Sequence, residues 1–229
     1  MSNSEVSVLN KATLHEGGFA GLREHRLVMS RALWGSNTSA GTWDGIGNFV
    51  YLADARFQPK GETTMHPHKE IDVISIMVEG RIAHEGSLEH GGSLEEHEAQ
   101  VQRAGGEGFS HNEVNPDETY NRMLQLWVTP ETAGQAAAYK KFSPKWGETT
   151  RIYGGIEGQT KSFPAETRID VVMLNPGQAV DLTGTYLAYL SKGTGRDNEQ
   201  KFKDGDLFRG ADVHFEAEFA SQLIIIRSS

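Results

Sequence analysis

The sequence predicts an all-β protein, made of two tandem antiparallel β-barrels that a short helix connects. Glycine is frequent, with 26 among 229 residues, and it separates short apolar stretches. This spacing is typical of antiparallel strands joined by tight turns. The two halves also share an order of strand, Pro-Gly turn, strand, glycine and strand, with the turns at residues 57–61 and 174–177. We interpret this order as a weak internal duplication, which predicts two small barrels.

Seven segments are rich in the Val, Ile, Leu, Tyr and Phe residues that pleated, half-buried surfaces favour. The predicted strands are residues 48–54, 71–79, 81–84, 124–129, 169–174, 185–190 and 222–227. Residues 71–78 are almost continuously apolar, which predicts a strand covered on both faces.

One segment, residues 129–139, is predicted to be helical. Thr129 suits the cap, Pro130 suits the first turn, and Glu131 suits the positive end of the helix dipole. A loop is expected over residues 141–166. We therefore divide the chain into residues 1–130, a first barrel that holds a metal site, and residues 131–229, a linker helix and a second barrel without metal ligands.

The amino-acid composition excludes several classes of function. The chain has 22 basic and 31 acidic residues, a formal charge of −9, which argues against direct binding of nucleic acid. It has no cysteine, so disulfides and thiolate catalysis are excluded and a metal must be bound by histidine or carboxylate. Its apolar runs are too short to cross a bilayer, and its first ten residues do not resemble a signal peptide. We expect a cytoplasmic protein without membrane association.

Two dyads, His66-x-His68 and His111-x-Glu113, carry the strongest functional signal. Alternate residues of a strand point to the same side, so each dyad directs two ligands into one space. Three imidazoles and one carboxylate suit Fe, Mn, Ni, Cu or Zn and leave positions open for a substrate. A structural metal site without chemistry is the alternative. The second half offers only His214, for which we expect a surface or core position.

Three stretches resemble the pirin family of the cupin superfamily. They are His-Pro-His-Lys-Glu-Ile-Asp at residues 66–72, Ala-Gly-Gly-Glu-Gly-Phe-Ser-His-Asn-Glu at residues 104–113, and Leu-Gln-Leu-Trp-Val at residues 124–128. The resemblance implies a bicupin of the double-stranded β-helix or jelly-roll type. It also implies that His66, His68, His111 and Glu113 hold one divalent metal. Fe(II) is the ion that the resemblance favours, and Cu, Ni, Mn or Zn are the alternatives.

The resemblance also assigns roles to two further residues. Asp72 stands where related sequences usually have Glu, and we expect a carboxylate that supports the ligands or the structure. Trp127 is expected to fill core space, with the lining of a substrate pocket as the alternative.

Pirin-like proteins include quercetin 2,3-dioxygenases, so the resemblance implies an oxidoreductase that opens a flavonol ring with dioxygen. Glu113 would then also be catalytic, as the base that removes the proton of the flavonol's 3-hydroxyl. The alternative is a metal-dependent regulator without turnover, a pirin-like transcriptional cofactor that binds a protein partner. A third possibility is an enzyme that acts on another small molecule, since cupin barrels host many reactions.

Overall fold

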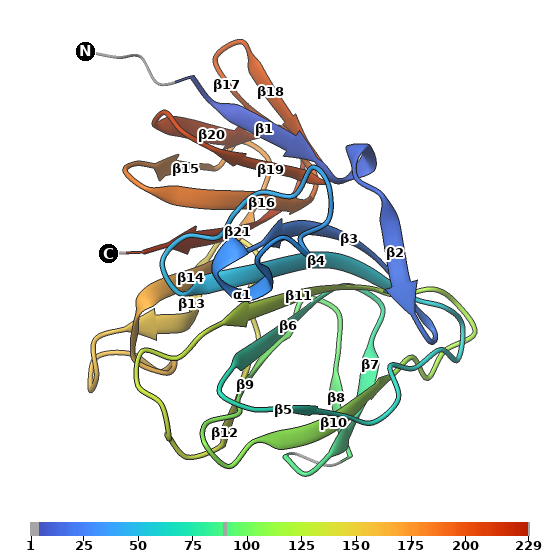
Figure 1. The fold of residues 1–229 in the computed structure, drawn as a ribbon. Coiled ribbons are helices and arrows are strands. Elements are labelled where there is room, and N and C mark those ends of the chain that lie inside the picture. Colours follow the sequence, from blue (N-terminus) through green and yellow to red (C-terminus); the bar gives the residue numbers. More distant parts are fainter. Residues whose placement is uncertain (1–4, 89–90, 229) are drawn as a thin grey trace. The chain divides into compact units, whose positions relative to one another are not determined.

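The computed structural model describes residues 5–88 and 91–228 and shows an all-β protein, as predicted (Figure 1). Its contacts divide the chain into two compact units. The N-terminal unit is Leu14–Ser143, and the C-terminal unit combines the first strand, β1 (Ser7–Asn10), with Pro144–Ser229. The predicted division at residue 130 differs from these limits in two places. Strand β12 (Ala138–Phe142) pairs within the N-terminal unit, and β1 pairs with β19 (Asp206–Arg209).

The N-terminal unit is built from a seven-stranded sheet and a four-stranded sheet, both antiparallel. The larger sheet has the order β12-β9-β6-β11-β4-β3-β2, and the smaller one has the order β5-β10-β7-β8. Besides β12, the strands are β2 (Glu16–Phe19), β3 (Leu22–Met29), β4 (Phe49–Phe57), β5 (His66–His68), β6 (Asp72–Glu79), β7 (Ile82–Gly86), β8 (Gly92–Leu94), β9 (Ala99–Arg103), β10 (Phe109–Val114) and β11 (Arg122–Val128). A single turn of helix, α1 (Arg31–Trp34), follows β3.

A shared core joins the two sheets of this unit. Phe57, Met77 and Met123 from the larger sheet are buried with Ile82 and Leu94 from the smaller one. Burial of such side chains is the main favourable contribution to folding. The alternation of apolar side chains along each strand therefore fixes which face of each sheet points inward.

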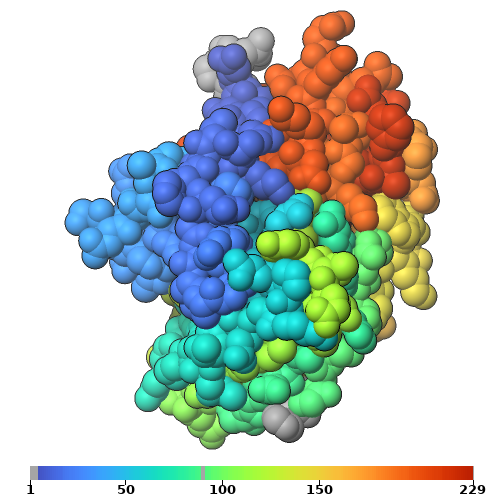
Figure 2. Space-filling view, turned by 90° about the vertical axis from the view of Figure 1, so that its right-hand side faces the viewer, coloured from blue at the N-terminus to red at the C-terminus, as the bar shows by residue number. Residues whose placement is uncertain are grey.

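Loops distant in sequence close one end of the N-terminal unit. The turn between β2 and β3 lies against residues 58–62, because Gly21 donates to the Glu62 carbonyl over 3.1 Å and accepts from the Gln58 amide over 2.9 Å. The loop between β10 and β11 lies beside residues 58–62, since the Lys60 amide donates to the Asp117 carbonyl over 3.0 Å. Figure 2 shows these segments as neighbouring blue, cyan and yellow-green surface.

The C-terminal unit also has two antiparallel sheets, of six and four strands, with the orders β1-β19-β16-β21-β14-β13 and β15-β20-β17-β18. Its remaining elements are η1 (Lys11–Thr13), β13 (Thr149–Gly155), β14 (Ala165–Leu174), β15 (Ala179–Leu182), β16 (Tyr186–Lys192), β17 (Thr194–Asp197), β18 (Gln200–Lys203), β20 (Val213–Ala217) and β21 (Ser221–Arg227). Phe202, Phe208 and Phe215 fill its core with rings whose centroids lie 4.3 to 6.3 Å apart. His214 is exposed and contacts Asp181 over 2.6 Å.

All seven predicted strands are present, as β4, β6, β7, β11, β14, β16 and β21. The predicted loop over residues 141–166 is wrong in part, because β13 lies within it and pairs with β14. β3 was not predicted either. Its sequence, Leu-Arg-Glu-His-Arg-Leu-Val-Met, places charged residues on a strand whose partners come from elsewhere in the chain.

The predicted helix over residues 129–139 is wrong, and every residue of that segment is described. Gly134 has a left-handed φ of 76°, which a right-handed helix does not allow. Its amide donates to Glu70 Oε1 over 3.0 Å, and the Gln135 carbonyl accepts from the Gly106 amide over 3.0 Å. These contacts, with Glu70 between β5 and β6 and with Gly106 in the turn before β10, override the helix propensity of a short segment.

No helix within the described ranges is long and apolar enough to cross a membrane.

A buried ion pair stabilises β4 and β11, the strands on which much of the candidate site is built. Arg122 Nε donates to both Asp54 oxygens, over 2.9 and 3.1 Å, and the two side chains are 1% and 2% exposed. Asp54→Ala leaves a buried guanidinium without this partner, so we expect it to lower the free energy of unfolding by about 3–5 kcal/mol. Chemical denaturation measures this loss.

The surface pair of Arg81 and Asp117, with a contact of 2.9 Å, supplies the control. Asp117→Ala is expected to change stability little, because exposed ion pairs contribute little. An Asp54→Ala protein as stable as the Asp117→Ala protein would contradict this account of the β4–β11 pair.

Candidate metal centre and adjoining cavity

Three histidines converge at the β5 edge of the smaller sheet. β5 pairs with β10 in a register that sets His66 opposite His111. His111 Nε2 lies 3.0 Å from His66 Nε2 and 3.2 Å from His68 Nε2. The ligand atoms of the three residues all lie within 4.8 Å of one another. The alternation of His66 and His68 around Pro67 therefore directs both rings to the same point as His111.

Hydrogen bonds on the other ring nitrogens fix how two of these imidazoles face that point. His66 Nδ1 lies 2.9 Å from the Thr64 carbonyl, and His111 Nδ1 lies 3.0 Å from Gln102 Oε1. Both partners accept hydrogen bonds, so each Nδ1 carries the proton and each Nε2 keeps a free lone pair. Gln102 Nε2 in turn lies 3.0 Å from His84 Nε2, so it donates to that buried ring. This arrangement of partners behind the rings is typical of metal-binding histidines.

Burial keeps two of the rings neutral. It lowers the pKa of His68 to about 4, with a further contribution from His66. Burial lowers the pKa of His111 to about 2, and the neighbouring rings of His68, His66 and His84 act in the same direction. Neutral imidazole is the form that binds metal. The donor set therefore fits a divalent transition metal without any rearrangement of protonation at neutral pH.

Glu113 stands outside this group of three, although it lines the same cavity. Its Oε1 accepts a hydrogen bond of 2.9 Å from Ser75 Oγ, and its amide donates to Thr63 Oγ1 over 3.0 Å. Burial raises the pKa of Glu113 to about 7, against the lowering effect of the Ser75 hydrogen bond. This carboxyl group can therefore exchange a proton near neutral pH.

Asp72 has a different environment. It is fully buried on β6 and forms an ion pair with Arg103 on β9, whose Nε and Nη2 donate to its Oδ2 over 3.2 and 3.1 Å. It is not among the described residues that line the cavity. In the structure its carboxylate links two strands of the larger sheet.

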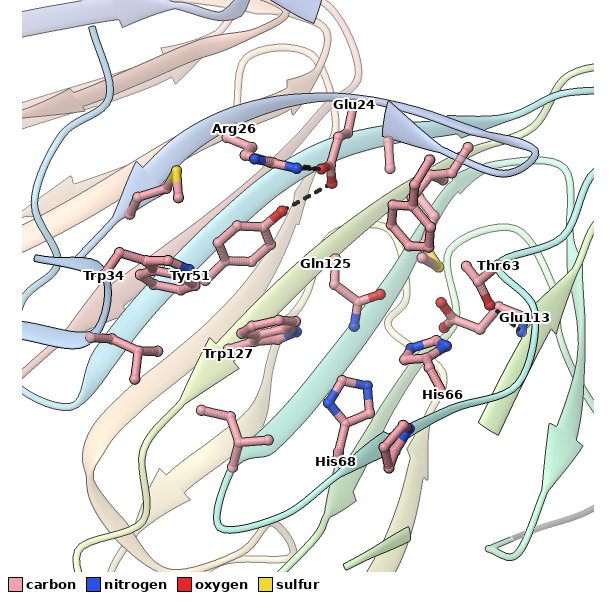
Figure 3. Close-up of a pocket in the computed structure, with 18 of the residues that line it drawn as sticks. Glu24, Arg26, Trp34, Tyr51, Thr63, His66, His68, Glu113, Gln125 and Trp127 are labelled. Atoms are coloured by element: carbon pink, nitrogen blue, oxygen red, sulfur yellow. Dashed lines mark hydrogen bonds and ion pairs between the residues drawn. The ribbon is translucent and has the colours of Figure 1, made fainter. Parts of the chain in front are cut away.

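A cavity of about 580 Å³ adjoins the histidines, a size typical of small-molecule sites. Its floor is the inner face of β3, β4 and β11, and one wall is aromatic (Figure 3). Trp127 lies with its ring centroid 4.7 Å from Tyr51 and 5.9 Å from Trp34 on α1. Trp127 thus meets both expectations, because it packs against the core and also lines the pocket.

A second polar group borders the cavity away from the histidines (Figure 3). The buried carboxylate of Glu24 accepts from Tyr51 Oη over 2.9 Å and from Arg26 Nε over 2.7 Å. Burial, and then the charge of Glu24, raises the pKa of Tyr51 well above its ordinary range. The pairing leaves this end of the cavity close to neutral.

Sequence reasoning missed Glu24, Arg26, Tyr51, Gln102 and Gln125 as site residues. None lies in a recognisable motif, and the only available signal is the period of two along their strands. That period places Glu24 and Arg26 on one face, but it does not show which cavity the face adjoins.

Comparisons with known proteins agree with the fold. Residues 40–128 match the family model named Pirin. A Zymomonas mobilis protein, provisionally named quercetin 2,3-dioxygenase, is 28% identical over 186 residues, which cover 76% of this chain and 79% of that protein. A relative from Pseudomonas aeruginosa is matched over 59% of its length. The Escherichia coli quercetin 2,3-dioxygenase is 31% identical over 77 residues, 33% of each chain.

Residues 40–128 of this chain thus resemble the Pirin family. The crystal structure of the bacterial pirin YhhW from Escherichia coli, solved with nickel(II), aligns with a TM-score of 0.79 over 97% of this chain and 98% of that one. The identity is 16%, so this likeness shows the fold alone. The resemblance to the pirin family that the sequence motifs indicated is confirmed, and the three histidines are the candidate site of a divalent metal in this protein.

Removal of one converging imidazole tests the metal centre. We expect the His111→Ala protein to bind less than one metal ion per chain, because the ligand atoms of all three histidines are needed to hold one ion. His214→Ala removes an exposed histidine from the C-terminal unit and is expected to keep it. Elemental analysis after loading and desalting measures the metal content. A His111→Ala protein that holds one metal ion as tightly as the native protein would rule out this centre.

The metal-free protein is expected to become less stable in acid, because its buried histidines stay neutral. Unfolded histidines take up protons below about pH 6.5. In the folded protein, His68 stays neutral until the pH approaches its pKa of about 4, and His111 until the pH approaches its pKa of about 2. The unfolded state therefore binds more protons, and stability falls as the pH drops from about 6.5 towards 4. Glu113 has the opposite effect on stability between about pH 4.5 and pH 7. Because its pKa is raised in the folded state, the folded protein binds more protons there, and this contribution to stability grows as the pH falls.

A comparison with His111→Gln isolates the imidazole contribution. The melting temperature of the metal-free native protein should fall relative to that of the variant as the pH is lowered through this window. A difference that is independent of pH would contradict the assignment of a neutral, buried His111.

Proposed function

We propose that this protein is a metal-dependent dioxygenase that opens the ring of quercetin or a related flavonol with dioxygen. The observation that carries the proposal is the cluster of three imidazoles facing an aromatic-walled cavity of about 580 Å³. The names of the relatives from Zymomonas mobilis and Escherichia coli support it.

His66, His68 and His111 would hold the metal, and Glu113 would complete the set from its position beside the cavity. Fe(II) is the ion that we propose, and the same donors also suit Ni, Cu, Mn or Zn. When bound, the metal would supply Lewis acidity and open positions for a substrate hydroxyl and dioxygen.

Glu113 is proposed as the base for the flavonol's 3-hydroxyl. With a pKa raised to about 7, its carboxylate can accept that proton near neutral pH. Ser75 Oγ donates to Glu113, Gln100 Nε2 donates to Ser75 Oγ over 3.3 Å, and Tyr139 Oη donates to Gln100 Oε1 over 3.3 Å. This chain of hydrogen bonds holds the carboxyl group in one orientation.

The aromatic wall is proposed to orient the substrate. Trp34, Tyr51 and Trp127 offer flat, apolar surfaces against which a planar ring system can lie. A ring held there is kept from water and aligned with the histidines, and alignment of reacting groups is a large part of catalysis.

A regulatory protein that binds a partner is the second candidate function. Among the large hydrophobic side chains that are exposed in the N-terminal unit, Phe19, Leu33 and Met65 lie in or next to the lining of the cavity. The first two line the cavity and the third precedes His66, so a partner that covers them would contact the metal centre. A stoichiometric complex that forms only with metal-loaded protein would favour this function.

Oxygen consumption on addition of quercetin tests the enzyme. Iron-loaded native protein is expected to consume dioxygen, and Glu113→Gln is expected to turn over about 10²–10⁴-fold more slowly, because the amide cannot accept the proton. Asp117→Ala, on the surface of the same unit, is the matched control and should retain full activity. Native-rate turnover by Glu113→Gln at equal metal content would remove the assigned base, and no uptake by native protein at full iron occupancy would remove quercetin as substrate.

A further inference from the structure

We propose that Gln125 and Trp127 form a pair of hydrogen-bond donors that selects planar ligands bearing oxygen acceptors. This inference rests on the proposed function, because it concerns how the same cavity holds its substrate. It goes further by assigning specificity to two residues of β11.

β11 presents alternate side chains to the cavity. Met123, Gln125 and Trp127 all line it, as the period of two along a strand requires. Gln125 pairs across the sheet with Ala53, and Trp127 pairs with Tyr51. Figure 3 shows the Gln125 amide between Trp127 and the histidines.

Two carboxylates that line the cavity already have partners. Glu24 accepts from Tyr51 and Arg26, and Glu113 accepts from Ser75. Gln125 Nε2 and Trp127 Nε1 are different, since both are buried and neither has an acceptor among the described residues. Buried polar atoms are nearly always satisfied in folded proteins, so these two donors, together with one acceptor, Glu70 Oε2, are left for a ligand of this cavity.

The two unpaired donors, Gln125 Nε2 and Trp127 Nε1, indicate which ligands the cavity can bind. A carbonyl, phenol or phenolate oxygen can accept from both groups, and a flat ring can lie along Trp34, Tyr51 and Trp127. The two donors and the aromatic wall thus fit an oxygen-substituted aromatic ligand.

Calorimetric titration of quercetin into iron-loaded protein without dioxygen tests the donor pair. Gln125→Met removes the amide at similar size, and Trp127→Phe keeps an aromatic ring but removes the N–H. Each variant is expected to raise the Kd about five- to tenfold, the effect of one lost neutral hydrogen bond, with metal content unchanged. Gln159→Met and Trp146→Phe make the same changes in the C-terminal unit and should bind like the native protein.

The outcomes separate this inference from the dioxygenase proposal. Quercetin binding that both variants weaken, without oxygen consumption by the native protein, removes the proposed activity and supports the donor pair. Oxygen consumption together with native affinity in both variants overturns the donor pair and leaves the activity. Failure of the native protein to bind quercetin overturns the donor pair's assigned ligand class.

Discussion

The pairing of β5 with β10 is the interaction on which the candidate site depends. β5 has only three residues, His66–His68, and its register on β10 sets His66 opposite His111 and Phe109 opposite His68. A shift of one residue would turn His66 and His68 to the other face of the sheet. Backbone hydrogen bonds between two short strands thus bring together imidazoles that lie 43 and 45 residues apart in sequence.

A buried polar network supports that pairing from within the N-terminal unit. Gln102 holds His111 and also donates to His84, while Ser75 holds Glu113. These side chains come from β6, β7 and β9, which are fixed by the core rather than by the metal site itself. The corresponding interior of the C-terminal unit is filled by Phe202, Phe208 and Phe215. The two units therefore share an antiparallel two-sheet plan, but only the N-terminal one combines histidines with a cavity in the part of the chain that the structure describes.

Local patterns in the sequence were sufficient for seven of the strands and for the histidine dyads. A period of two places His66 beside His68 and His111 beside Glu113, and apolar runs such as the one in β6 identify the central strands. The helix prediction over residues 129–139 failed because contacts of Gly134 and Gln135 with distant residues determine that segment. The roles of Glu24, Tyr51 and Gln125 were not predictable, because they follow from cross-strand registers that join β3, β4 and β11.

The central claim is that three imidazoles hold a divalent metal that faces the cavity. X-ray absorption spectroscopy of the iron-loaded protein, before and after addition of quercetin without dioxygen, tests it most directly. The account predicts scattering from three imidazole rings, and a changed coordination environment once quercetin is present. A spectrum with fewer than three imidazoles, or one that quercetin leaves unchanged, would contradict it.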